Sequence, residues 1–524
     1  MKIERLLLGL FASFLMVGCS QNDDLPGNAE EQGNEKKSYV AVEICSPKAL
    51  GSRATEADDF ADAKGNEGVV TCAHFFFYND NGDPVNINQG KNYVTKILDT
   101  TPDTDENGST ESTTETVVVL EKPDVYPTRM VVVLNWNYSG ASLTLNETTG
   151  LAEQSIAESV AIEQATGFIM SSSVYYDGGI VNYAKIDGSN FGATPTDAQT
   201  KPVKAYVERL AAKVTSSLKT TDNSTNYDSS LEAFDTGVTY KDANGTENKI
   251  YAKILGWQIN TTNPSSYLIK HLKSEWGTNA PFIDWNESGK FRSYWGVSST
   301  PTQYDKKAFN YENITAGFDH TAYCLENTTG TSTKALFKAE IGKVGASGQF
   351  EALELWQWYG KYYLSLDAMM VDVLASINAE VKKLKADATP VTAGQIKLVY
   401  NTVPATSYQI NFALADNQTD VDLTATKKLS DVIAETDYAK NWDGGKTYYF
   451  TSIKHLNGEL AVIRNHAYHL LVTEVKGLGT PVNDPTVQPE IPEPVDPGTT
   501  ETYIAAQINV LSWRLVSNDV TLGH

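Results

Sequence analysis

The chain has 524 residues and a mass of 57.3 kDa, too long for one ordinary core, so we expect two domains with tails. It carries 65 acidic and 42 basic residues, a formal net charge of −23. Such an acidic surface repels phosphate backbones, which argues against a nucleic-acid-binding protein. Short Val-, Ile- and Tyr-rich runs alternate with Thr-, Asn-, Ser- and Gly-rich stretches, a pattern that favours a mainly-β fold.

Residues 1–19 form a processing segment. Charged MKIER precedes the 12-residue apolar run LLLGLFASFLMV and then Gly18-Cys19. The run is shorter than the roughly 20 residues that span a bilayer, and the order is typical of an export signal. Gly18-Cys19 indicates a bacterial lipoprotein in which Cys19 becomes the lipidated first residue; an ordinary secretory signal is the alternative. Residues 20–37 follow as a polar tether without apolar periodicity.

The first strand is predicted over residues 38–46, SYVAVEICS. Val40, Val42 and Ile44 share one face because side chains alternate along a strand. The pattern is that of a half-buried strand.

An acidic, Gly- and Ala-rich stretch follows, and we expect it to be an exposed loop that proteases can cut. Arg53 is the one arginine between Arg5 and Arg129, so an Arg-specific protease has a single target in this loop. Residues 38–53 are therefore predicted to be a removable first strand with its cleavage loop.

Residues 54–201 are predicted to be an N-terminal β domain. Strands are expected over VVTCAHFFFYNDNGDPV, TETVVVLEK, RMVVVLNWN and GFIMSSSVYYD, and a short helix over EQSIAESVAIEQA. The unbroken Val runs indicate strands that are buried on both faces. A strand pattern restarts at PVKAYVERLAAKVTSSL after a Thr/Pro-rich loop, so we place the domain boundary near residue 202.

Residues 202–476 are predicted to be a C-terminal β domain interrupted by two helices. The first helix is expected over SYLIKHLKSEW, residues 266–276. The second, over LDAMMVDVLASINAEVKKLKA, has an apolar stripe at helical spacing that is typical of core packing. The stripe comprises Met370, Val373, Leu374, Ile377, Val381 and Leu384.

Residues 477–501 contain six of the 19 prolines. Pro-rich sequence favours extended polyproline II, so this spacer is predicted to reach on the order of 60–75 Å. It leads to a last strand, residues 502–524, which is expected to be a donor strand in two parts, 502–510 and 511–518. The apolar positions change parity between the parts, which predicts a bulge or a change of sheet. The first part has Ile504, Ala506, Ile508 and Val510 on one face, and the second has Leu511, Trp513 and Leu515.

The hexapeptide YIAAQI at 503–508 echoes YVAVEI at 39–44. A β-sandwich that loses a strand exposes backbone hydrogen-bonding groups and an apolar groove, and an extended peptide with the same period can replace the strand. A removable strand, a cleavable loop and a mimic on a spacer together predict polymerisation: cleavage empties the groove, and the donor strand of the next subunit fills it.

Three short motifs suggest chemistry, and each has a more ordinary explanation. Ser216–Lys219 fits Ser-x-x-Lys but lacks partner motifs and lies in a strand pattern. DTDENG from Asp103 begins like a calcium loop, but the bidentate acid at the twelfth position is missing. His466 and His469 lie in a strand pattern, where residues three apart point to opposite faces. We therefore expect no enzyme activity, no metal and no cofactor.

The exported part of the chain has three cysteines, Cys45, Cys72 and Cys324. Because three is odd, at least one thiol is unpaired or pairs between chains. A Cys45–Cys72 bridge and buried free thiols remain equal alternatives.

Five blocks, AYVERLAAKV, FRSYWGVS, YCLENT, RNHAYHLLVTEVKGLG and YIAAQINVLSWRLVSNDVTL, resemble the fimbrillins of Bacteroidia type V pili, most closely the shaft subunits of minor (short) fimbriae. The resemblance covers essentially the whole chain. It implies two domains of transthyretin-like β-sandwich type and export as a lipoprotein, with Cys19 (palmitate) as the lipid site. It also implies Arg-specific cleavage of the Arg53–Ala54 bond and strand-exchange polymerisation on the cell surface.

The partners implied by the resemblance are further copies of this chain, accessory subunits at the tip and anchor, an Arg-specific protease and, before cleavage, the outer membrane. The implied role is a structural fimbrial subunit, with functions in adhesion, biofilm formation and virulence. Two alternatives remain open: a tip or anchor fimbrillin, and a surface glycan-binding lipoprotein of the starch-utilisation type, a class dominated by helical repeats.

Overall fold

The structure, a computed structural model, describes most of the chain in a series of segments. They are residues 37–45, 65–87, 89–98, 114–121, 125–146, 150–151, 155–162, 167–173, 175–176, 180–220, 226–270, 307–327, 333–455, 461–487, 489, 503–511 and 515–518.

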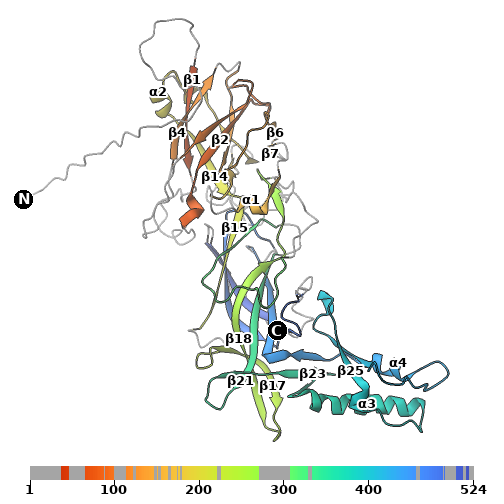
Figure 1. The fold of residues 1–524 in the computed structure, drawn as a ribbon. Coiled ribbons are helices and arrows are strands. Elements are labelled where there is room, and N and C mark those ends of the chain that lie inside the picture. The colour runs from red at the N-terminus through yellow and green to blue at the C-terminus, as the bar shows by residue number, and fades with distance from the viewer. Residues whose placement is uncertain are drawn as a thin grey trace, which may run out of the picture.

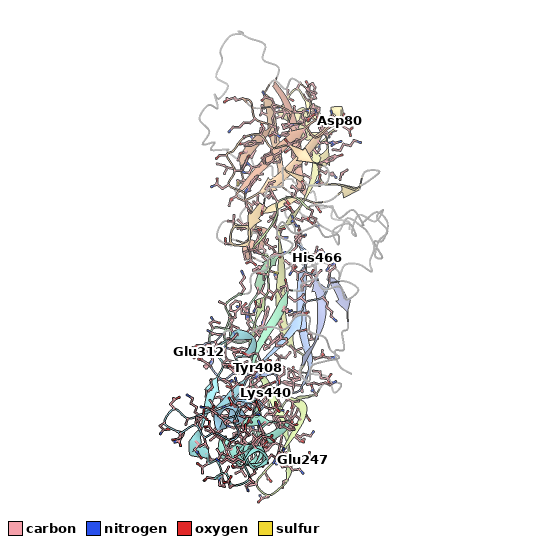
Figure 2. The ribbon with its side chains drawn as sticks, turned by 90° about the vertical axis from the view of Figure 1, so that its right-hand side faces the viewer. Asp80, Glu247, Glu312, Tyr408, Lys440 and His466 are labelled. Atoms are coloured by element: carbon pink, nitrogen blue, oxygen red, sulfur yellow. The ribbon has the colours of Figure 1, made fainter. Side chains whose placement is uncertain are left out.

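The predicted mainly-β fold is confirmed, because strands dominate the described elements. Figure 1 shows an elongated molecule with a first sheet at one end, two sheets below it, and a side module that projects at the other end. In Figure 2, Asp80 and Glu247 mark the two ends, and His466 lies near the middle.

The first sheet curls around one apolar core. Along β2, Phe75 and Phe77 face this core, whereas Phe76 and Tyr78 belong to a cluster on the outer face. The unbroken apolar run therefore reflects burial on both faces. The sheet order is β13-β1-β14-β9-β5-β2-β3, with β4 on β1 and β12 on β5. The strands are β1 (Lys37–Cys45), β2 (Cys72–Tyr78), β3 (Tyr93–Ile97), β4 (Thr114–Glu121), β5 (Arg129–Leu134), β9 (Met170–Ser172), β12 (Ala184–Lys185), β13 (Phe191–Gly192) and β14 (Val203–Arg209).

Short elements complete this part of the chain. They are η2 (Gly65–Gly68), β6 (Leu145–Asn146), β7 (Gly150–Leu151), β8 (Ser155–Ala157), α1 (Glu158–Ala161), β10 (Tyr175–Tyr176), β11 (Ile180–Val181), η3 (Gly188–Asn190) and α2 (Pro195–Gln199).

Two sheets form a sandwich below the first sheet. Val214 and Leu470 of one sheet pack in the same core cluster as Ile254 and Phe337 of the other. The sheet orders are β20-β15-β29-β31-β32 and β16-β17-β18-β21-β28-β30, with β22 on β21. The strands are β15 (Ala211–Leu218), β16 (Tyr227–Asp228), β17 (Ala233–Lys241), β18 (Glu247–Asn260), β20 (Ala322–Leu325), β21 (Lys334–Val344), β22 (Phe350–Ala352), β28 (Lys446–Ser452), β29 (Ala467–Lys476), β30 (Thr480–Pro481), β31 (Tyr503–Leu511) and β32 (Leu515–Asn518).

The chain passes from the first sheet to the sandwich at Leu210, between β14 and β15. The boundary expected near residue 202 falls before β14, a strand that pairs with β1 and β9 in the first sheet. The run PVKAYVERLAAKVTSSL is thus two strands in two sheets, and the junction between the sheets lies within it.

The predicted helix over residues 266–276 is wrong in its described part. Residues 265–267 form β19 (Ser265–Tyr267), which pairs with β8. Leu268, Ile269 and Lys270 are each at most 1% exposed, so this apolar run is buried on all sides instead of on one helical face. The rest of the predicted helix lies outside the described residues.

A side module, residues 355–442, is inserted between β22 and β28. Its core cluster draws only on residues 356–439, so it packs as a unit of its own. The long helix was predicted, but its fully buried stripe begins at Met369 instead of Met370. The module contains β23 (Leu355–Trp358), β24 (Lys361–Tyr363), α3 (Leu366–Leu384), η6 (Ala393–Gln395), β25 (Ile396–Tyr400), η7 (Pro404–Thr406), β26 (Ile410–Leu414), α4 (Leu429–Ala434) and β27 (Lys440–Trp442), and η8 (Asp443–Gly445) follows it.

In the described segments, no helix combines the length and apolarity needed to span a bilayer.

Candidate strand-exchange site

The strand β1 is paired on both of its edges. On one edge it runs antiparallel to β4 over eight residue pairs, from Lys37↔Glu121 to Ile44↔Thr114. On the other edge it pairs first with β13 and then, in parallel, with β14, where Val42 lies opposite Val203. A strand with partners on both sides is an inner strand of its sheet.

The middle of β1 is completely buried. Val40, Ala41 and Val42 are each 0% exposed, and Val40 and Val42 lie in the inner core with Val118 and Phe75. The prediction of a half-buried strand is therefore wrong for these residues, because Ala41 is covered as well. Ile44, the third predicted groove residue, has its backbone paired with Ala205, and its side chain is outside the described residues.

Loss of β1 would leave a slot with two unpaired edges. The edges would belong to β4 on one side and to β13 and β14 on the other. Unpaired backbone donors and acceptors next to an exposed apolar core are costly, so the slot would bind an extended segment that restores both ladders.

The body of the chain is anchored just after the predicted cleavage loop. In η2, the Glu67 carboxylate accepts hydrogen bonds from Lys213 Nζ at 2.5 Å and from the Tyr323 hydroxyl at 2.6 Å. The Glu67 backbone carbonyl accepts a bond from Arg209 Nε at 2.6 Å. A cut before Gly65 therefore leaves the body tied at the junction between the sheets. The predicted cleavage residues Arg53 and Ala54 and the predicted lipid site Cys19 lie outside the described residues.

The predicted donor strand lies on the chain's own sandwich. Strand β31 runs antiparallel to β29, from Lys476↔Tyr503 to Ala467↔Leu511. This segment therefore has a pairing partner within its own chain, which the sequence did not indicate. Of the predicted donor residues, Ile504, Ala506, Ile508, Val510 and Leu511 lie in β31.

The second half of the predicted donor folds back on the first. Strand β32 pairs antiparallel with β31, with Val510 opposite Val516 and Leu511 opposite Leu515. The parity change after Val510 thus coincides with a hairpin, so the expected bulge or change of sheet is wrong. Trp513, in the connection, lies outside the described residues.

The predicted spacer is shorter than expected. Leu478 and Val482 are buried, at 2% and 3% exposure, and β30 pairs with β28. The first part of residues 477–501 therefore belongs to the sandwich. The 15 residues 488–502 are left to connect it to β31, a span of at most about 45 Å in polyproline II geometry.

Charged residues gather at the junction between the first sheet and the sandwich. Arg464 and Glu326 form an ion pair at 2.6 Å with both side chains 0% exposed, and Arg464 also donates to the Leu268 carbonyl at 3.1 Å. Lys270 pairs with Glu208 of β14 at 2.9 Å, at 1% and 0% exposure. Sequence reasoning missed this network, although the charges within VERLAAK were a signal that this strand run is interrupted.

The histidine motif forms no metal site. His469 Nδ1 and Nε2 lie 2.9 Å and 2.8 Å from the hydroxyls of Thr215 and Ser217, and burial lowers the pKa of the His469 imidazole. His466 Nδ1 lies 2.8 Å from the Arg464 carbonyl. In the part of the chain that the structure describes, no group of three or more His, Cys, Asp and Glu side chains could hold a metal ion.

The other motifs of the sequence either have a structural role or lie outside the residues that the structure describes. Ser216 donates to the Leu470 carbonyl at 2.9 Å within the sheet, and the calcium-like loop from Asp103 is outside the described residues. Cys72 and Cys324 are free thiols, so the Cys45–Cys72 bridge is not formed.

Residues 441–519 match the family model described as "Major fimbrial subunit protein type IV, Fimbrillin, C-terminal". The predicted fimbrillin resemblance is confirmed over this region, which runs from β27 through β31 to the end of β32. No curated protein matches the chain.

Solved structures that resemble this chain share little sequence with it. A candidate cell adhesion protein from Parabacteroides distasonis is 13% identical, with 90% of this chain and 96% of that chain covered and a TM-score of 0.35. A fimbrial assembly protein from the same organism is 11% identical, with 58% and 81% covered and a TM-score of 0.27. A C-terminally truncated tip fimbrial protein from Porphyromonas gingivalis is 10% identical, with 91% and 100% covered and a TM-score of 0.28. At TM-scores this low, the likeness does not establish a shared fold.

Proposed function

Because residues 441–519 match the fimbrillin C-terminal region, we propose that this chain is a structural subunit of a cell-surface fimbrium. It is exported as a lipoprotein through Cys19, held at the outer membrane, and cleaved at the Arg53–Ala54 bond by an Arg-specific protease. Cleaved subunits polymerise by strand exchange, in which β31 of one copy fills the slot that β1 leaves in the next.

The observation that carries this proposal is the position of β1. It is buried and paired on both edges, yet the sequence between β1 and Gly65 contains the one arginine between Arg5 and Arg129. A strand at such a position is not dispensable unless another strand replaces it. The segment YIAAQI has the chemical pattern of YVAVEI in the same chain direction.

The echo also fixes the register of the exchange. If Tyr503 takes the place of Tyr39, then Ala505 takes the place of Ala41, opposite Val117 of the neighbour's β4. Ala506 takes the place of Val42, and Gln507 that of Glu43. The donor then runs parallel to the neighbour's β14, as β1 does.

Exchange requires that the donor leave its own sandwich. Strand β31 pairs with β29 before cleavage, so its own sheet competes with the slot of a neighbour. In its own chain β31 pairs with β29 on one edge and with β32 on the other, so a polymer forms when the slot's two ladders and its inner core together outweigh these two ladders.

A shaft subunit is the assignment we propose, with accessory subunits at the tip and anchor and a role in adhesion. A tip or anchor subunit is the second candidate, and it would lack either cleavage or a usable donor strand. The glycan-binding alternative required helical repeats. It is dropped because the fold is mainly β and the longest helix described, α3, has 19 residues.

Limited digestion of the purified precursor with an Arg-specific protease tests the proposal. The expected products are a body that begins at Ala54 and, on an unheated denaturing gel, a ladder of polymers that collapses on boiling. A cleaved body that stays monomeric at high concentration would contradict strand exchange. An Arg53→Gln precursor is the matched control, and it should give neither the body nor the ladder.

A further inference from the structure

We infer that the helix α2 sets the register of strand exchange. It covers one position of the slot too closely for a long side chain, and the residue at that position is Ala41 in the precursor and Ala505 in the donor strand. This inference rests on the proposed function and deepens it, because it concerns the alignment in which β31 of one copy fills the slot of the next.

The helix α2 lies on the face of β1 opposite the inner core. Phe191 of β13 is the partner of Val40 and packs against the inner core with it. Because side chains alternate along a strand, Gly192 faces the other way, and a Cβ atom there would clash with the backbone nitrogen of Ala198 in α2. The helix packs against β1, β4 and β13, and Figure 1 shows it beside β1 at the upper end of the first sheet. It therefore lies across the outer side of the slot.

Ala41 lies on this outer side and is covered. It is flanked by Val40 and Val42, which point into the inner core, so its methyl group points outward. It is nevertheless 0% exposed, whereas Val117, its partner in β4, is partly exposed. The cover is thus local, and α2 supplies it with its one buried residue, Ala198, at 1% exposure. The space under the helix at this position accommodates a methyl group.

The loop that carries α2 is held by its own hydrogen bonds. The Thr194 hydroxyl accepts a bond from the Asp197 backbone N–H at 3.1 Å, and the Asp197 carboxylate accepts one from the Thr194 N–H at 3.2 Å. Pro195 occupies the first turn of the helix, where its fixed φ suits a helical start. At the base of the loop, Asn190 Nδ2 donates to the Lys201 carbonyl at 2.9 Å. The helix therefore resists displacement by a larger side chain beneath it.

The apolar pattern of β31 does not define one register by itself. In the proposed register the inner positions 40, 42 and 44 receive Ile504, Ala506 and Ile508. A shift of two residues would place Ala506, Ile508 and Val510 there, and the inner face would remain apolar because the side-chain period of a strand is two. Alternation thus excludes shifts by one residue but not shifts by two.

The position under α2 distinguishes these registers. In the proposed register Ala505 takes the place of Ala41, and YVAVEI and YIAAQI both have alanine at this point. A shift of two residues would place Gln507 under α2 in one direction and Tyr503 in the other. Both side chains would overpack a site that accommodates a methyl group, and overpacking is destabilising. The helix thus selects the register in which Ala505 lies opposite Val117 of the neighbour's β4.

The size of the side chain at residue 505 tests the inference. The full-length Ala505→Leu variant is digested with an Arg-specific protease and run on an unheated denaturing gel. We expect the cleaved body in normal yield but at least tenfold less ladder than the unsubstituted chain gives, because leucine does not fit under α2. The matched control is Gln507→Leu, which adds the same side chain on the same face but beside β14, since position 43 pairs with Lys204. This control should give the full ladder.

A second measurement does not depend on the donor strand. Ala41→Leu places the larger side chain under α2 in the uncut precursor, so we expect its urea midpoint to fall clearly below that of the unsubstituted precursor. Ala375→Leu is the matched control, because the same substitution at an exposed position of α3 causes no overpacking. Its midpoint should equal that of the unsubstituted precursor.

The possible failures are distinguishable. A full ladder from Ala505→Leu, or an unchanged urea midpoint of Ala41→Leu, overturns the inference and leaves strand exchange intact. Equal loss of the ladder in Ala505→Leu and Gln507→Leu also overturns it, because the effect would then not be specific to the position under α2. If the unsubstituted cleaved body gives no ladder, the proposed function fails and the inference fails with it.

Discussion

In the single chain, Ile508 of β31 lies opposite Leu470 of β29. The strand that carries the echo of β1 is thus already paired within its own molecule. Polymerisation by strand exchange therefore has two requirements, an empty slot in one copy and a released β31 in the other.

Locking β31 onto β29 should block polymerisation. Glu474 and Ala505 are Cα partners in this ladder, so the Glu474→Cys, Ala505→Cys variant can form a disulfide there. We expect the oxidised variant to be cleaved normally but to give no ladder on an unheated gel, and reduction should restore the ladder. A ladder of equal intensity in both redox states would show that β31 is not the donor.

Except at the position under α2, substitutions on the face of β31 that enters the slot should impair polymerisation far more than substitutions on its other face. In the proposed register Ala506 replaces the buried Val42, whereas Gln507 replaces Glu43. Ala506→Asp would bury an unpaired charge in the slot, which costs several kcal/mol, so we expect loss of the ladder. Gln507→Asp is the matched control and should polymerise like the unsubstituted chain. Equal behaviour of the two variants would contradict the register.

The precursor should depend on β1 for its stability. Val42 is 0% exposed in the inner core, and truncation of a buried aliphatic side chain leaves a cavity, so Val42→Ala should lower the free energy of unfolding by about 2–3 kcal/mol. Urea denaturation of the precursor measures this. Val160→Ala, at a half-exposed position, should stay within about 0.5 kcal/mol. The account of β1 is wrong if both variants are equally stable.

The junction should be sensitive to loss of a buried charge partner. Arg464→Met removes the cation that pairs with the buried Glu326 carboxylate at 2.6 Å, which should cost about 3–5 kcal/mol in unfolding free energy. Lys397 forms a surface pair with Asp416, with side chains 40% and 86% exposed, so Lys397→Met should cost less than about 1 kcal/mol. Thermal unfolding of both variants compares them, and similar melting temperatures would argue against a structural role for the Arg464 network.

Stability should fall in mild acid because of His74. Its Nε2 lies 2.5 Å from the Trp136 carbonyl and its Nδ1 2.9 Å from the Thr95 hydroxyl, so Nε2–H donates and Nδ1 accepts. Burial lowers the pKa of His74, so the unfolded chain binds a proton more readily than the folded one. The contribution is present above the unfolded pKa of about 6.5 and is lost as the pH falls below it. The urea midpoint should therefore drop between about pH 7 and pH 5, with a shallower drop in His74→Gln.

Much of the fold follows from local sequence patterns. The unbroken Val run of β5 predicted a strand buried on both faces, and Val131 and Val132 do enter different clusters. The stripe of α3 was predicted to within one residue, because helical periodicity is a local property. Boundaries that depend on pairing between strands distant in the sequence were harder to predict. Val482 lies in a stretch with the composition of a Pro-rich spacer, but it is buried because β30 pairs with β28.

Only part of the candidate site could be predicted from the sequence. The echo of YVAVEI in YIAAQI predicted two interchangeable strands, and their alternation is local. The pairing of β31 with β29 joins segments that a spacer separates in the sequence, and the hydrophobic periodicity of a strand does not reveal its pairing partner. The buried charges at Glu208 and Lys270 resemble solvated strand ends in the sequence, and their pairing at 2.9 Å depends on chain segments that meet only in the folded state.

The central claim is that β31 of one copy replaces β1 of the next. A disulfide between Ala505→Cys and Val117→Cys tests it most directly, since these positions become opposite only after exchange, while Ala505 lies opposite Glu474 before it. After Arg-specific cleavage and oxidation, the account predicts a ladder of covalent multimers on a boiled, non-reducing gel that reduction converts to monomer. A ladder on unheated gels together with only monomer on boiled non-reducing gels would contradict it.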